Sequence, residues 1–79
     1  MPMTAGERIT VLIKRRGWNI AKLAESISVM FPDHATSPQN LANKLRRDNF
    51  TEQELIRIAQ ALGCTYKSSF VMIDTGEEV

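Results

Sequence analysis

The chain has 79 residues, a hydrophobic content of 43% and a net charge of +1, which excludes a disordered chain and allows one domain with a modest core. No apolar run approaches the length that spans a membrane, and the first residues lack the apolar stretch of a signal peptide, so we expect a cytoplasmic protein. The single cysteine, Cys64, excludes an internal disulfide and a cysteine-based zinc site.

Two amphipathic helices are predicted in the first part of the chain. A Thr-x-x-Glu capping box at Thr4 opens a helix that should run to about Arg16, with Gly17 as a left-handed stop. Asn19 can cap a second helix, and Pro32 should end it because proline disfavours helical geometry in the residue before it. The apolar residues recur at three- and four-residue steps. The predicted buried positions are Ile9, Leu12, Ile13, Ile20, Leu23, Ala24, Ile27, Met30 and Phe31.

After a loop at residues 32–36, two more helices are predicted. Ser37 is a favourable N-cap, and Pro38 suits the first helical position, where its missing N–H has no partner to lose. This third helix should end near Arg47. A capping box that starts at Thr51 opens the fourth helix, and Gly63 ends it. Its predicted inward residues are Leu55, Ile58, Ala59 and Leu62.

The last part of the chain has a different pattern. Residues 65–73, TYKSSFVMI, are rich in β-branched and aromatic residues without a helical period, which predicts one strand followed by a turn at residues 74–76. A lone strand needs partners for its backbone groups. The simplest partner is the same strand of a second copy across a two-fold axis, and the alternative is a tail that packs Phe70 onto its own bundle. The predicted dimerisation residues are Tyr66, Ser68, Phe70 and Met72.

The segment SPQNLANKLRR, residues 37–47, combines an apolar ridge with a polar face. At about 100° per residue, Pro38, Leu41 and Leu45 lie on one side, opposite the amide and guanidinium groups. Asparagine and glutamine are mediocre helix formers, but they pair bidentately with adenine edges, as arginine and lysine do with guanine. The pattern therefore predicts a helix that reads a nucleic acid. The plainer alternative is a solvated face on an ordinary bundle.

The charges of the chain are unevenly distributed. All ten basic residues lie at or before Lys67, whereas three of the nine acidic residues lie in the last six positions. Residues 1–67 therefore carry ten positive and six negative side chains, a net charge of +4. A mildly basic body with an acidic tail permits nucleic-acid binding without requiring it.

Three segments resemble the lambda repressor and Cro-like helix-turn-helix family. NIAKLAESI is similar to the first helix of the family's motif, SPQNLANKLRR to its recognition helix, and FTEQELIRIAQALGC to the helix that closes the domain. The resemblance implies a mainly α fold: a compact four-helix helix-turn-helix domain at residues 1–64, followed by the strand and acidic tail at 65–79. The nine residues 28–36 before the Ser37 cap are a departure, since the family usually needs only a couple there.

The resemblance also implies a binding mode. In this family the recognition helix lies in the major groove of DNA, and its first residues meet base edges. The base-reading residues would then be Gln39, Asn40 and Asn43. Phosphate or flanking contacts would come from Ser37, Lys44, Arg46, Arg47 and, on the preceding helix, Lys22.

The sequence therefore predicts a dimeric, sequence-specific DNA-binding regulator of phage-repressor type rather than an enzyme. Its expected partners are double-stranded DNA and a second copy of the chain, with no cofactor, metal or membrane. It has no phosphate-cradling glycine loop or metal-ligand spacing, and its only histidine, His34, lies in the predicted loop. The alternative is an antitoxin-like or adaptor protein on the same scaffold, which would bind a different chain along the edge of the C-terminal strand.

Overall fold

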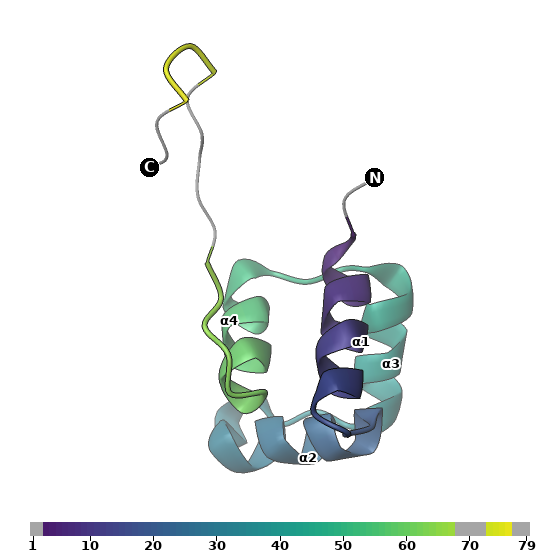
Figure 1. The fold of residues 1–79 in the computed structure, drawn as a ribbon. Coiled ribbons are helices and arrows are strands. Elements are labelled where there is room, and N and C mark those ends of the chain that lie inside the picture. Colours follow the sequence, from purple (N-terminus) through teal and green to yellow (C-terminus); the bar gives the residue numbers. More distant parts are fainter. Residues whose placement is uncertain (1–2, 68–72, 77–79) are drawn as a thin grey trace.

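The computed structural model describes residues 3–67 and 73–76. Within them the chain forms α1 (Ala5–Arg15), α2 (Ile20–Met30), the short 3-10 helix η1 (Pro32–His34), α3 (Pro38–Arg47) and α4 (Glu52–Ala61) (Figure 1). The four predicted α-helices are thus confirmed, whereas η1 lies in the segment predicted as a loop. In the described part of the chain, no helix has the length and apolar character needed to cross a bilayer.

The helix boundaries follow from side-chain caps. Each α-helix begins where a side-chain oxygen accepts a hydrogen bond from a backbone N–H of the first turn, which has no partner within the helix. The capping box of α4 is complete, because the Glu54 carboxylate also accepts from the N–H of Thr51 (3.2 Å). In α1 the Glu7 carboxylate accepts from the Thr4 hydroxyl instead (3.2 Å). The four capping residues are Thr4, Asn19, Ser37 and Thr51.

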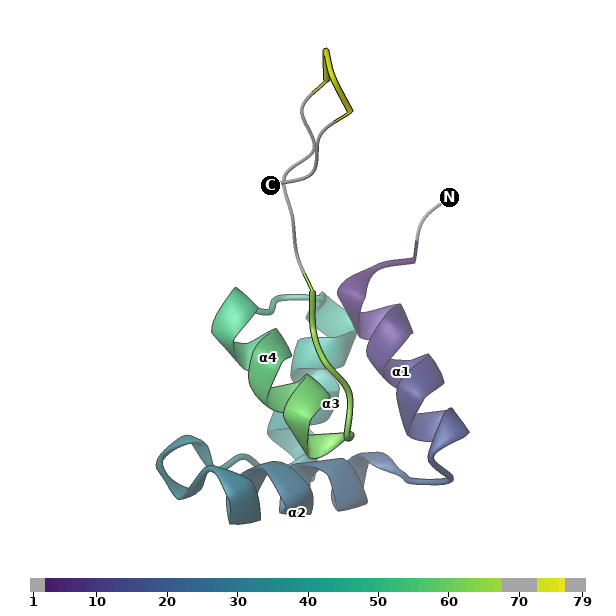
Figure 2. The ribbon, with the colours of Figure 1, turned by 60° about the vertical axis from the view of Figure 1, so that its left-hand side comes forward.

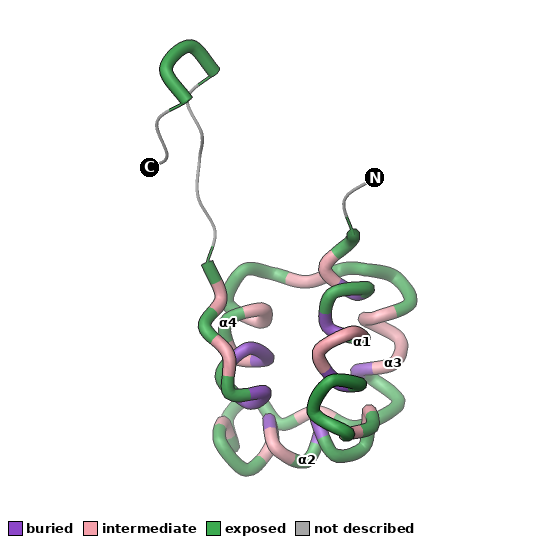
Figure 3. The backbone as a smooth tube through the Cα atoms, in the orientation of Figure 1, coloured by how far each residue is buried: buried purple, intermediate pink, exposed green. Residues whose placement is uncertain are grey.

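One hydrophobic core joins the four helices. α2 packs against both α3 and α4, and α1 packs against α3; Figure 2 shows α2 crossing the base of the other helices. The buried positions lie on the inner sides of the helices (Figure 3), and half-buried residues such as Leu12, Leu45 and Trp18 pack around them. The core residues are Ile9, Ile13, Leu23, Ala24, Ile27, Leu41, Ile58, Ala61 and Leu62.

Two residues predicted to be buried are exposed. Met30 is 50% exposed, at the last position of α2. Pro38 is exposed as well. It occupies the first position of α3, and the buried side of that helix begins one turn later at Leu41.

The predicted C-terminal strand is wrong: residues 3–67 and 73–76 contain no strand, so the fold they form is mainly α only. Residues 64–67 instead line a groove between α1 and α4, where the half-buried Tyr66 shares the lining with Leu12 and Leu55. Residues 73–75 form a turn, one residue before the position predicted for it. The other proposed dimerisation residues, Ser68, Phe70 and Met72, lie outside the described residues.

The start of α1 lies against the end of α3. A Cβ atom on Gly6 would come within 2.8 Å of the Leu45 carbonyl oxygen and 3.2 Å of Asp48 Oδ1. The same Oδ1 accepts a hydrogen bond from the Gly6 N–H (2.7 Å), which satisfies a free donor of the first turn of α1. Asp48 has a left-handed backbone (φ 53°) that ends α3. The carboxylate that follows one helix therefore holds the beginning of another.

We expect Gly6→Ala to lower the free energy of unfolding by about 1–3 kcal/mol, because the new methyl group would press on the backbone of α3. At a helical position without such a contact, the same change would stabilise the protein by up to about 1 kcal/mol. The sign of the effect therefore reports the contact. Urea unfolding followed by the fluorescence of Trp18 measures it, and an unchanged or raised free energy would contradict the close packing.

Candidate nucleic-acid interface

α3 carries its polar residues on the side opposite its buried leucine. Leu41 is the only buried residue of this helix, at 2% exposure, and Leu45 is half-buried beside it. The predicted division into inner leucines and outer polar residues is confirmed. The polar residues outside are Gln39, Asn40, Arg46 and Arg47, which are exposed, and Asn43, which is half-buried.

Ser28 joins the two ends of residues 29–35, which we call the excursion between α2 and α3. Its hydroxyl oxygen accepts a hydrogen bond from the N–H of Thr36 (3.0 Å) and lies 2.9 Å from the Ala24 carbonyl oxygen and 3.0 Å from that of Thr36. Its one hydrogen can serve one of these carbonyls at a time. The chain of residues 29–35 therefore returns beside its starting point, and Phe31 within it packs against the core. Although residues 28–36 precede the Ser37 cap, the hydrogen bond between Ser28 and Thr36 keeps the beginning of α3 beside α2.

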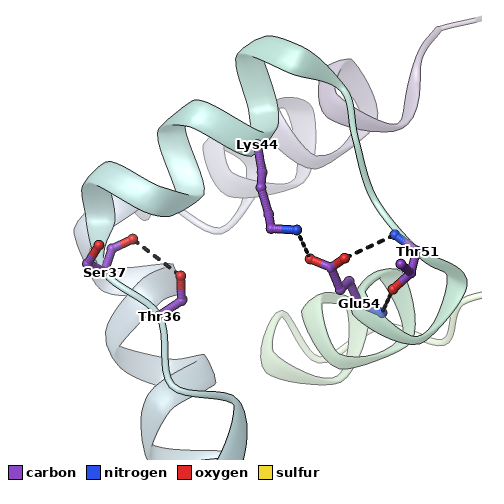
Figure 4. Close-up of polar contacts among 5 residues, drawn as sticks. All are labelled: Thr36, Ser37, Lys44, Thr51 and Glu54. Atoms are coloured by element: carbon purple, nitrogen blue, oxygen red, sulfur yellow. Dashed lines mark hydrogen bonds and ion pairs between the residues drawn. The ribbon is translucent and has the colours of Figure 1, made fainter.

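Lys44 connects α3 to α4 (Figure 4). Its ammonium group forms an ion pair with Glu54, whose carboxylate also accepts from the N–H of Thr51. Burial alone would raise the pKa of Glu54, but the hydrogen bonds from Lys44 and Thr51 together outweigh burial, and the pKa falls below its ordinary value of 4.5. Lys44, predicted as a flanking contact to DNA, therefore serves first to attach α3 to the bundle.

Asn43 and Arg46, both predicted to meet DNA, interact with each other. Arg46 Nη2 donates a hydrogen bond to Asn43 Oδ1 (2.8 Å). An asparagine that accepts through its oxygen keeps two N–H donors for other partners. The contact therefore orients the Asn43 amide and leaves it able to donate.

Two further predicted contacts have roles within the fold. Ser37 Oγ accepts from the Asn40 N–H (3.1 Å) as the cap of α3. Lys22 places its Nζ 5.7 Å from the centroid of the Trp18 ring, a cation–π distance. Both residues are exposed, and Lys22 lies on α2 rather than with the polar face of α3.

A hollow of about 530 Å³ lies beside α3 and brings predicted and unpredicted residues together. Residues 34–36 and the α4 residues Glu54, Arg57 and Ile58 form its other walls. Four of the residues predicted to contact DNA are not part of the lining: Lys22, Ser37, Gln39 and Arg46. The lining residues from α3 are Asn40, Leu41, Asn43, Lys44 and Arg47.

Several polar residues of this hollow were not among the predicted site residues. They are His34, Thr36, Thr51, Glu54 and Arg57. Arg57 follows Glu54 by three residues, so the two lie on the same side of a helix. That spacing is the signal that could have found Arg57, once Glu54 is known to face α3. The resulting arrangement offers amide and guanidinium donors. Within the described residues, no three histidine, cysteine, aspartate or glutamate side chains gather as a metal site requires.

We expect Ser28→Ala to lower the free energy of unfolding by about 1–3 kcal/mol, because the partly buried N–H of Thr36 loses its acceptor. The amide hydrogen of Thr36 should then exchange faster with solvent, as NMR can measure. Ser26→Ala, on the same helix, is the matched control and should leave this exchange rate unchanged. Equal protection of Thr36 in both variants would refute the role of Ser28.

The ion pair between Lys44 and Glu54 should make stability depend on pH. Because the pKa of Glu54 is lowered in the folded chain, its carboxylate stabilises the fold above pH 4.5, and this stabilisation is lost as the pH falls through the folded pKa. The free energy of unfolding of wild type should therefore exceed that of Glu54→Gln at neutral pH, with a difference that shrinks in acid. Glu25→Gln, at an exposed site of α2, is the control. A constant difference for Glu54→Gln would contradict the ion pair.

The comparisons with known proteins identify a family but no activity. No curated protein and no solved structure matches the chain. One family model, described as "Domain of unknown function (DUF6471)", matches residues 3–66, a range that includes all four helices. That description leaves the resemblance to the lambda repressor and Cro-like proteins as a prediction. The chain belongs to the DUF6471 family.

Proposed function

We propose that the protein is a sequence-specific DNA-binding regulator that inserts α3 into the major groove of double-stranded DNA. The observation that carries the proposal is the composition of α3: one buried leucine, and an outer surface of amides and guanidinium groups. Such a role would place the protein with DNA in the cytoplasm.

The amides of α3 support the proposal of DNA binding more strongly than its positive charges do. The three basic residues of α3 lie in its last turn, where cations stabilise any helix through its dipole, so a structural role alone would account for them. No comparable benefit explains Gln39 and Asn40 at exposed sites, since glutamate or lysine would favour the helix at least as well. Bidentate pairing with base edges gives these amides a role.

The position of each residue suggests how DNA would be bound. Gln39 and Asn40 lie in the first turn of α3, the part that reads bases in helix-turn-helix proteins. Asn43, oriented by Arg46, lies one turn further along. Arg47, at the far end of the helix, is suited to a phosphate, which adds affinity without sequence information.

The alternative of an adaptor that binds another chain through a C-terminal strand has lost its basis, since the described residues contain no strand. The same finding removes the strand that was predicted to pair two copies. The proposal therefore concerns one α3 helix and the base pairs that it meets.

We expect Asn40→Ala or Gln39→Ala to cost about 1–3 kcal/mol of binding free energy at one base position, and Arg47→Ala to weaken binding to all sequences alike. Binding-site selection followed by fluorescence anisotropy on the selected and altered sites measures both effects. Gln60→Ala, an exposed amide on α4 outside the hollow, is the matched control and should bind as wild type does. A wild-type chain without any sequence preference would sink the proposal.

A further inference from the structure

We infer that the hollow between α3, α4 and residues 34–36 is a phosphate-binding site, and that its occupant is a backbone phosphate of the DNA read by α3. This inference rests on the proposed function and adds to it a second contact, which involves a different helix and the excursion before α3.

The charges that line the hollow favour an anion. Its basic residues are Lys44, Arg47 and Arg57, and its one acidic residue, Glu54, is already paired with Lys44. Among the described residues, Arg47 and Arg57 have no ion pair, so the hollow keeps two uncompensated positive charges. Because like charges repel, both would be stabilised by an anion between them.

The types of side chain point to phosphate in particular. A guanidinium group presents a planar fork of N–H donors that matches two oxygens of a phosphate. Arg57 is half-buried, and a partly desolvated guanidinium gains more from such a partner than an exposed one does. The amides of Asn40 and Asn43 add neutral donors to the same lining.

The hollow is continuous with the proposed reading face. Asn40, Asn43 and Arg47 belong to both, so a phosphate held here would lie next to the bases that α3 meets. The third wall comes from residues 34–36, which the contact between Ser28 and Thr36 holds in place. The excursion between α2 and α3 thereby gains a role: it builds one side of the phosphate site.

Arg57→Gln tests the inference, because it removes the charge and keeps an amide donor. We expect weaker binding to every DNA sequence, a salt dependence of log K reduced by about one, and unchanged base preference. Arg8→Gln, which removes an exposed charge from α1 near the groove on the α1–α4 side, is the matched control and should keep the wild-type slope. If Arg57→Gln does not fold, Arg57→Lys should keep the salt slope and lose affinity, because its ammonium lacks the fork.

Titration with inorganic phosphate tests the site without DNA. His34 is the only histidine, so its ring Hε1 proton gives a single NMR signal of its kind, which at constant pH should shift in a saturable way in wild type and not in Arg57→Gln. Selective DNA binding with an unchanged slope in Arg57→Gln would overturn the inference and leave the proposed function standing. If the wild-type protein binds DNA without sequence preference, the proposed function is overturned, and so is the statement that the phosphate belongs to DNA read by α3. The titration then decides on the site itself, and an absence of saturable shifts would refute it.

Discussion

The burial of Leu41 is the contact on which the presentation of α3 depends. A helix made mostly of polar side chains has little apolar surface with which to attach itself. Burying one leucine contributes about 1.5–3 kcal/mol, whereas fixing the backbone of each residue costs about 1–2 kcal/mol. α3, with ten residues and this one buried side chain, therefore needs further contacts to hold one orientation.

Those contacts are polar, and each attaches a different part of α3 to a different helix. The residue before its cap, Thr36, is held by Ser28 of α2; Lys44, in its second half, is paired with Glu54 of α4; and Asp48, just after it, binds the N–H of Gly6 in α1. Of the three side chains that make these contacts, only that of Lys44 belongs to α3 itself; the others are Ser28 and Asp48. Gln39, Asn40 and Arg47 stay exposed on the polar face, so the residues that attach α3 differ from most of those proposed to meet DNA.

The sequence predicted those features that depend on local chemistry. The caps and the bounds of α3 follow from a few neighbouring residues, and the outward position of Asn40 or Arg47 follows from the helical repeat. The features it missed depend on how elements pack. Arg57 reaches the hollow because of the way α4 lies beside α3. The predicted strand failed because β-branched and aromatic side chains favour packing as much as backbone pairing, and the bundle supplies a surface for Tyr66.

The stretch between α2 and α3 is where the chain departs most from the helix-turn-helix pattern, and it is also where fold and proposed function meet. Extra residues at this point would displace α3 if they simply lengthened the connection. The Ser28 hydroxyl prevents this by joining the two ends of the excursion, so α3 keeps its attachment to α2 while Phe31, within the excursion, packs against the core. Residues 34–36 then stand beside Asn40 and Arg47 as a wall of the hollow. If α3 reads DNA as proposed, an insertion that leaves this helix in place can therefore enlarge the surface that meets DNA without altering the residues that meet the bases.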